Sequence, residues 1–272
     1  MGFPKSLLAG VSSCVTGLGM QPLVRFAEIG ASLLQGKGSG NLDLSAEIRA
    51  AAACITCQDP VFLDVGAHHG KWALGMMRLF PEAQRVVLCE PQAECVATLR
   101  MLELPGKIIV PAAVCDHVGA EPLYVSGAGW FAASLYERRE TIFARSPQNP
   151  TMVPVTTLDA VLEHEGIETV DFAKFDIEGA ELAAFHGASR SFSRGAIGAL
   201  SLEFGPSNIN SRTFFRDFWQ FLTDHGFEIF RVLPGGRTLR ISQYHEDLEY
   251  FQGFTNYVCR NTRYQRSALA AA

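Results

Sequence analysis

The sequence lacks several patterns that would assign it at once to a class of protein. Its 272 residues contain no apolar run of the ~18 residues that a membrane-spanning helix needs. Positive charge is scarce, because 23 lysines and arginines face 28 acidic residues and give a formal net charge of -5. This balance argues against nucleic acid or an anionic membrane surface as the main partner and leaves small molecules and neutral glycans. The N-terminus has no clean signal-peptide cleavage site, so we expect a cytoplasmic protein.

The cysteines form no disulfide-like or zinc-like pattern. There are seven, an odd number, and several lie in apolar runs such as 86–89. Free, buried thiols in a reducing compartment are the natural interpretation. Cys54 and Cys57 have the CxxC spacing of redox and zinc sites, but no second CxxC or spaced histidine pair accompanies them. We therefore interpret this pair as structural.

Short apolar runs alternate with helix-period segments from Pro60 onward, which predicts an α/β domain with a parallel sheet and helical crossovers. The apolar, glycine-interrupted residues 1–58 predict an N-terminal helical extension, either a lid or a dimer contact. We expect the main domain over 59–265 and a disordered tail or cloning remnant over 266–272. The expected core strands are 61–65, 85–90, 107–114, 170–177 and 196–204, with helices over 71–80 and 92–102.

A glycine turn follows the first expected strand, where open α/β sheets bind ligands. Its pattern is D-x-G-x-x-x-G, formed by Asp64, Gly66 and Gly70, so the GxGxxG fingerprint of dinucleotide sites is absent. Glu90 ends the second strand, the position from which an acid binds ribose hydroxyls. Together these residues favour a nucleoside with a charged amino-acid tail, such as S-adenosylmethionine (SAM), over a purely structural turn.

At these residues the sequence resembles the FkbM family of SAM-dependent methyltransferases. The resemblance runs from about Phe62 to Cys259 and rests on a set of motifs: DVGAHHG (64–70), LCEP (88–91), AVCD (113–116), ASL (133–135), VTTLD (155–159), KFDIEGAE (174–181) and LEF (202–204). The stretches around Phe204 and Thr255 resemble a branch associated with O-methylation of glycans and natural products. Family members usually have Asn where this chain has His68.

The resemblance implies a Rossmann-like class I methyltransferase fold with a mostly parallel central sheet flanked by helices. It also implies SAM as the methyl donor and a hydroxyl group as the acceptor. The positions that it assigns to the cofactor are Asp64, Gly66, Ala67, His68, Gly70, Glu90, Pro91, Asp116 and Asp176.

The KFDIEGAE stretch carries three carboxylates at the end of the fourth expected strand. Asp176 lies nearest the predicted methyl group, so it is the leading candidate for the general base or for the group that orients the acceptor. Glu178 is assigned equally to acceptor binding and to helix capping, whereas Glu181 is expected to cap. Lys174 is expected to be an ion-pair partner of Asp176.

Further catalytic candidates are Glu203, at the end of the fifth strand, and His69, in the glycine turn. With Asp176 and Glu178 they could also hold Mg²⁺ or Ca²⁺, although acids acting without a metal are preferred because no compact acidic ligand loop is present. Polar residues suited to sugar hydroxyls, with ordinary loop hydrogen bonding as the alternative role, are Asn208, Asn210, Arg212, Asn256 and Tyr257.

The sequence therefore predicts a SAM-dependent O-methyltransferase that acts on a sugar, a glycan or a polyketide-like natural product, as a monomer or a homodimer. Two alternatives stay open. One is a nicotinamide-dependent oxidoreductase, which the missing GxGxxG disfavours. The other is a non-catalytic binding protein on the same fold, since fold does not fix function.

Overall fold

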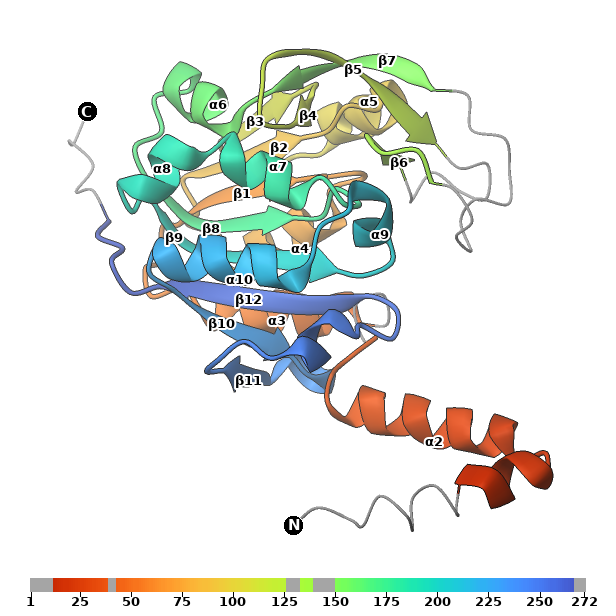
Figure 1. Cartoon of the computed structure of the whole chain (residues 1–272). Helices are drawn as coiled ribbons and strands as arrows, with labels where there is room; N and C mark the ends of the chain where they lie inside the picture. Colours follow the sequence, from red (N-terminus) through yellow and green to blue (C-terminus); the bar gives the residue numbers. More distant parts are fainter. Residues whose placement is uncertain (1–11, 39–42, 126–132, 139–149, 267–272) are drawn as a thin grey trace.

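The computed structural model describes residues 12–38, 43–125, 133–138 and 150–266. Its centre is an eight-stranded sheet with the order β11-β10-β12-β9-β8-β1-β2-β3 (Figure 1). Strands β9, β8, β1, β2 and β3 run parallel, whereas β12, β10 and β11 add on in antiparallel pairs. The α/β architecture with a mostly parallel centre is confirmed. The bounds are β1 Val61–Val65, β2 Arg85–Cys89, β3 Lys107–Val110, β8 Val170–Phe175, β9 Ile197–Phe204, β10 Phe227–Val232, β11 Thr238–Ile241 and β12 Thr255–Asn261.

Helices cover both faces of this sheet, because its central strands are buried on both sides. One face carries Phe62, Phe172 and Val258 and packs against α3, α4 and α5. The other carries Leu63, Ala173 and Leu200 and packs against α6, α7, α8 and α10. The bounds are α3 Leu44–Ala52, α4 Lys71–Leu79, α5 Ala93–Met101, α6 Leu158–His164, α7 Glu181–His186, α8 Ser189–Ser193, α9 Ser207–Ser211 and α10 Phe215–Asp224.

A second, four-stranded sheet lies over the carboxyl ends of the central strands, with the order β4-β7-β5-β6. Its strands are β4 Ala113–Val114, β5 Gly119–Val125, β6 Ala133–Ser134 and β7 Thr151–Thr156. The expected strand over 107–114 is wrong in this respect: β3 and β4 belong to different sheets. Pro111 separates them, and proline has no amide hydrogen to continue a ladder.

Two other boundaries differ from the expected ones. β8 ends at Phe175 rather than at residue 177, and α7 begins at Glu181 rather than at Gly179. The intervening residues form a tight turn with Glu178 and Gly179 at φ 56° and 104°. Such left-handed φ values fit neither a strand nor a helix.

The N-terminal helices differ in how they contact the domain. Helix α2 (Gln21–Leu34) extends away from the body in Figure 1, and Phe26 is 74% exposed. Helix α3 packs its Ala50 and Ala51, both 0% exposed, into the same core as α4. Residues 44–52 are therefore part of the domain core, although the sequence assigned them to an extension.

All seven cysteines are free thiols, as predicted, but only Cys89, Cys95, Cys115 and Cys259 are buried. Among the described residues no helix is long and apolar enough to cross a membrane.

Candidate active site

A cavity of about 400 Å³ opens at the carboxyl ends of the central strands. The chain runs from β1 outward to β2 and β3 on one side, whereas β8 and β9 lie on the other side of β1. Such a reversal of strand order is the place where open α/β sheets bind ligands. Of the predicted site residues, those that line the cavity are Gly66, Ala67, His68, His69, Glu90, Pro91, Asp176, Glu178, Glu203 and Asn256.

The turn after β1 brings two motifs together. The Gly66 and Ala67 amides donate to the Cys89 carbonyl oxygen at 3.0 and 3.1 Å, and the Asp176 amide donates to the Val65 carbonyl oxygen at 3.0 Å. A Cβ atom at Gly66 would lie 2.0 Å from the carbonyl oxygen of Asp176. Glycine is therefore required here, both for this contact and for its φ of 85°.

Glu90 fixes the glycine turn at one end of the cavity, which we call the cofactor end and define by Gly66, His68 and Glu90. It is 3% exposed, and its two carboxylate oxygens accept the His68 amide at 2.8 Å and the Gln92 amide at 2.9 Å. Burial raises the pKa of Glu90, whereas the Gln92 and His68 amides oppose that shift. A carboxylate has about four lone-pair sites, so Glu90 can hold the glycine turn and still accept two ribose hydroxyls.

Two buried ring nitrogens at the cavity have no hydrogen-bond partner in the described part of the chain. Trp72 Nε1 and His69 Nδ1 make no hydrogen bond with described residues, and both residues line the cavity. Buried polar atoms are normally paired. An acid with free lone pairs, a glycine turn and two unpaired ring nitrogens fit the hydroxyls and the amino-acid carboxylate of SAM. Trp72 is a cavity residue that sequence reasoning missed.

Asp64 lies behind the cavity and does not line it. It is 0% exposed, and Lys174 Nζ lies 3.9 Å from Oδ1. Neither of its oxygens makes a well-formed hydrogen bond with the described residues, although the nearby Ala73 amide lowers the pKa slightly. Burial raises the pKa of Asp64 to about 7, and Lys174 opposes the shift. This acid thus acts on the site through Lys174.

Lys174 is the buried cation of the site, and its ion pair with Asp176 is confirmed. Its Nζ lies 2.8 Å from Asp176 Oδ2. Burial alone would lower the pKa of Lys174, but Asp176, Asp64 and Glu47 outweigh burial and raise it well above its ordinary value. Lys174 is therefore charged, and it holds the 40% exposed Asp176 side chain at the cavity surface.

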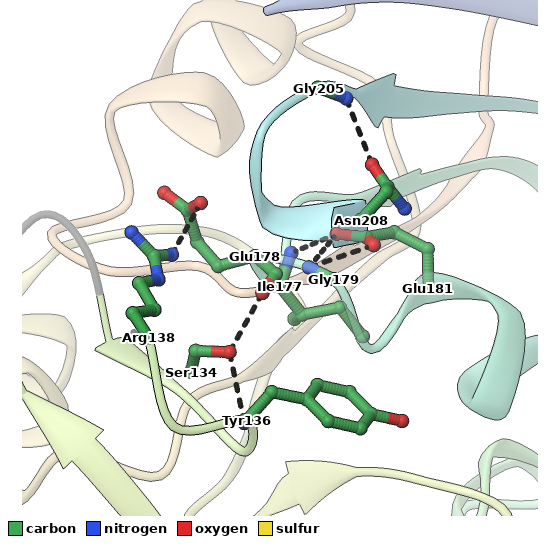
Figure 2. Close-up of polar contacts among 9 residues, drawn as sticks. All are labelled: Ser134, Tyr136, Arg138, Ile177, Glu178, Gly179, Glu181, Gly205 and Asn208. Atoms are coloured by element: carbon green, nitrogen blue, oxygen red, sulfur yellow. Dashed lines mark hydrogen bonds and ion pairs between the residues drawn. The ribbon is translucent and has the colours of Figure 1, made fainter. Parts of the chain in front are cut away.

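Glu178 occupies a left-handed backbone conformation that its contacts stabilise (Figure 2). Arg138 Nη2 lies 2.7 Å from Glu178 Oε2, and Ser134 Oγ donates to the Glu178 carbonyl oxygen at 2.7 Å. A non-glycine residue at positive φ is strained, and such strain gathers at functional sites. Burial raises the pKa of Glu178 to about 7, against the opposing effect of Arg138. The small sheet is thereby tied to the KFDIEGAE turn.

Glu181 was expected to cap the helix, but α7 has no side-chain cap hydrogen bond, and Glu181 stabilises the turn before it instead. Its carboxylate accepts the Ile177 amide at 3.0 Å and the Gly179 amide at 3.0 and 3.2 Å (Figure 2). Those amides belong to the turn before α7 rather than to the helix itself. Burial raises the pKa of Glu181 to about 7, against the effect of these amide hydrogen bonds.

Glu203 and Glu47 complete the acidic end of the cavity. Glu203 is 8% exposed, and burial, followed by Asp176 and Glu178, raises its pKa well above the ordinary value. Glu47 lies on α3 and lines the cavity, and burial raises its pKa to about 7, against the opposing charge of Lys174. Although the Glu47 residue keeps partial exposure, protein atoms surround its carboxyl group. Sequence reasoning missed Glu47 because no motif marks it.

The carboxylates could also receive a cation. Asp176, Glu178 and Glu203 each offer an oxygen, and these atoms lie within 4.8 Å of one another. His69 is not part of that group; it clusters with His68 and Cys95 instead. The donor set of the predicted metal site is thus only partly brought together.

Several predicted residues lie outside the cavity. Asn208 lies in the short helix α9, and its Oδ1 accepts the Gly205 amide at 2.8 Å. Tyr257 is a core residue whose ring lies 4.6 Å from that of Phe215. Asp116 is paired with His117 at the surface, 2.8 Å away. The predicted residues absent from the cavity lining are Asp64, Gly70, Asp116, Asn208, Asn210, Arg212 and Tyr257.

Comparisons with solved structures give distant likenesses. One is a methyltransferase FkbM from Methylobacillus flagellatus, at 16% identity and a TM-score of 0.47, with 74% of this chain and 44% of that chain covered. The chain thus spans less than half the length of that relative. A precorrin-6y C5,15-methyltransferase from Geobacter metallireducens matches at 12% identity and a TM-score of 0.42, over 84% and 94% of the two chains. An rRNA methylase from Streptococcus thermophilus matches at 10% identity and a TM-score of 0.43, over 82% and 95%.

No curated protein gives a significant match. The family model of the methyltransferase FkbM domain matches residues 64–229, more than half of the chain. That range begins at Asp64 and includes the glycine turn, Glu90 and the KFDIEGAE stretch. The chain belongs to the FkbM family of SAM-dependent methyltransferases.

Proposed function

We propose that the protein transfers a methyl group from SAM to a hydroxyl group of a sugar, a glycan or a polyketide-like natural product. The observation that carries the proposal is the position of Asp176: a partly exposed carboxylate, held by Lys174 at 2.8 Å, that lines the same cavity as Glu90, Glu178 and Glu203. When bound, SAM supplies a methyl group on a positively charged sulfur. The nicotinamide alternative is set aside by the family.

Different residues bind the cofactor and accept the proton. Glu90 and the turn at Gly66 hold the nucleoside, and Trp72 Nε1 and His69 offer donors to the amino-acid carboxylate. Asp176 accepts the proton of the acceptor hydroxyl while the oxygen of that hydroxyl takes the methyl group. The electron pair of the broken carbon–sulfur bond stays on sulfur. A positioned base of this kind contributes ~10²- to 10⁴-fold to the rate.

The acidic lining also supports an acceptor without phosphates. Glu47, Asp176, Glu178 and Glu203 surround the acceptor end, and like charges close together are unfavourable. We accordingly propose a small-molecule or glycan acceptor rather than nucleic acid, in a cytoplasmic setting that matches the seven free thiols.

The test is a screen of hydroxyl-bearing sugars and macrolides for SAM-dependent methylation, together with the variant Asp176→Asn. We expect SAM binding to persist in the variant and turnover to fall by ~10²- to 10⁴-fold. The matched control is Asp224→Asn, an exposed aspartate at the end of α10 that should keep full activity. Undiminished turnover in Asp176→Asn would remove this residue from the mechanism.

A calorimetric titration with SAM separates the enzyme from a non-catalytic binding protein on the same fold. Binding of SAM without methylation of any acceptor in the screen would favour the binding protein. Absence of SAM binding would contradict the proposed function altogether.

A further inference from the structure

The acceptor end of the cavity carries more carboxylates than the described residues pair with cations. Its lining includes Glu47 from α3, Asp176 and Glu178 from the turn after β8, and Glu203 from β9. Two cations lie against this group. Lys174 pairs with Asp176 Oδ2 at 2.8 Å, and Arg138 pairs with Glu178 Oε2 at 2.7 Å.

At this end of the cavity, Glu47 and Glu203 form no ion pair within the described residues, and of the two Glu203 lies beside Asp176 and Glu178. It is 92% buried, by its 8% exposed fraction, and it lines the cavity. In the described part of the chain no ion pair and no hydrogen bond engages its carboxylate, whereas Asp176 and Glu178 lie within 4.8 Å of it. A buried acid without a cationic partner is unfavourable in its charged form. Its surroundings are therefore suited to a positive group that arrives with a ligand.

Ser201 gives a second and independent indication of a ligand. It is 3% exposed, it lines the cavity, and its Oγ has no hydrogen-bond partner among the described residues. It lies two residues before Glu203 on β9, so both side chains are on the same face of the sheet. Asn256 pairs with Glu203 across the β12–β9 ladder and also lines the cavity. A hydroxyl and a carboxylate side by side form a set of acceptors for N–H groups.

We infer that the acceptor carries a protonated amine close to the hydroxyl that is methylated, as in amino sugars and aminocyclitols. Glu203 and Ser201 bind this ammonium group, whose three N–H donors match several acceptors at once. Asp176 then faces the neighbouring hydroxyl. The inference rests on the proposed function and adds the substrate class to it.

The same groups distinguish an ammonium from a divalent metal ion. A metal held by Asp176, Glu178 and Glu203 would lie next to two cations, Lys174 and Arg138, that already occupy one oxygen of two of these carboxylates. An ammonium brings a single positive charge to Glu203, a lining carboxylate that has no cation partner among the described residues. The charges of the site therefore favour the amine.

The experiment uses the full chain saturated with S-adenosylhomocysteine and matched pairs of small probes. Glucosamine is compared with N-acetylglucosamine, and galactosamine with N-acetylgalactosamine, by calorimetry. Each pair keeps the hydroxyls and differs in the charge on nitrogen. We expect the amine to bind at least about tenfold more tightly than its N-acetyl partner in the wild type.

The variant Glu203→Gln should remove this preference and leave the affinity for S-adenosylhomocysteine unchanged. The matched control is Glu103→Gln, an exposed glutamate away from the cavity, which should keep the preference. Equal or tighter binding of the N-acetyl compounds overturns the inference. So does a Mn²⁺ titration in which the metal binds to the wild type, not to Glu203→Gln, and displaces the amine.

Failure of this inference and failure of the proposed function give different results. If methylation is found only with neutral, amine-free hydroxyl compounds, the O-methyltransferase stands and the amine subsite is wrong. If the amines bind but no hydroxyl compound is methylated, the subsite stands and the proposed function is wrong.

Discussion

The two ends of the cavity are built in different ways. The cofactor end is built from segments that are close in sequence. The turn at Gly66 and the acid Glu90 lie within one β-α-β unit and are joined by hydrogen bonds that backbone amides of the turn donate. At the acceptor end, carboxylates arrive on separate elements, with Glu47 on α3 and Glu203 on β9. The first end is held together by hydrogen bonds from backbone amides, whereas the second depends on charge balance among side chains far apart in the sequence.

That charge balance depends most on Lys174, so its removal should have the largest effect. Lys174→Met leaves Asp64 and Asp176 without their cation, and breaking a buried pair in this way costs about 3–5 kcal/mol of unfolding free energy. Urea unfolding measures the loss as a lower midpoint at constant m-value.

The matched control is the exposed pair Arg240–Glu228, whose side chains are 61% and 37% exposed. Arg240→Met should change stability by no more than about 1 kcal/mol. Lys174→Arg, which keeps the charge, should recover part of the stability. Equal stability of Lys174→Met and Arg240→Met would show that the acidic end does not need its cation.

Substitutions at the cofactor end should lower the affinity for SAM rather than the stability of the fold. Glu90→Ala removes the acceptor of the His68 and Gln92 amides together with the predicted ribose contact. Hydrogen bonds to a charged group are worth about 1.5–3 kcal/mol, so SAM should bind roughly 10- to 100-fold more weakly. Calorimetry with SAM measures this change. Glu94→Ala, at an exposed position in the first turn of α5, should bind SAM normally.

The same contrast explains what the sequence could predict. The motif at Asp64 to Gly70 and the acid Glu90 are local in sequence, and the structure brings the turn and Glu90 together at one cavity. Glu47 was missed because only the packing of α3 against the sheet carries it to the site. The four-stranded sheet was missed as a unit since β5 and β7 pair across residues 126–150.

Asn208 is the opposite case, a residue predicted to contact the acceptor that lies in α9, outside the cavity lining. Its Nδ2 donates to Thr213 Oγ1 at 2.9 Å and its Oδ1 accepts the Gly205 amide, in a residue that is 2% exposed. Asn208→Ala leaves a buried amide unpaired and should cost about 2 kcal/mol of stability, with no change in acceptor KM. Asn210→Ala, whose Oδ1 has no hydrogen-bond partner in the described structure, should lose much less. A raised KM in Asn208→Ala at unchanged stability would restore its predicted role.

The smallest predicted effect is the contribution of Glu181 to the pH dependence of stability, which distinguishes it from the neighbouring acids Asp176 and Glu178. Burial raises the pKa of Glu181 from an ordinary 4.5 to about 7, so between these values the folded state binds more protons than the unfolded state. Its stabilising contribution is therefore complete below about pH 4.5 and is lost as the pH rises towards 7. Glu181→Gln keeps an oxygen for the Ile177 and Gly179 amides and does not titrate, so the fall in unfolding free energy between pH 6 and pH 7 should lessen by roughly 1 kcal/mol. Urea unfolding at pH 5, 6 and 7 measures it against Glu163→Gln, a glutamate whose side chain is 71% exposed and whose variant should follow the wild-type curve. A Glu181→Gln curve as steep as the wild-type curve would assign the pH dependence to the acids that line the cavity.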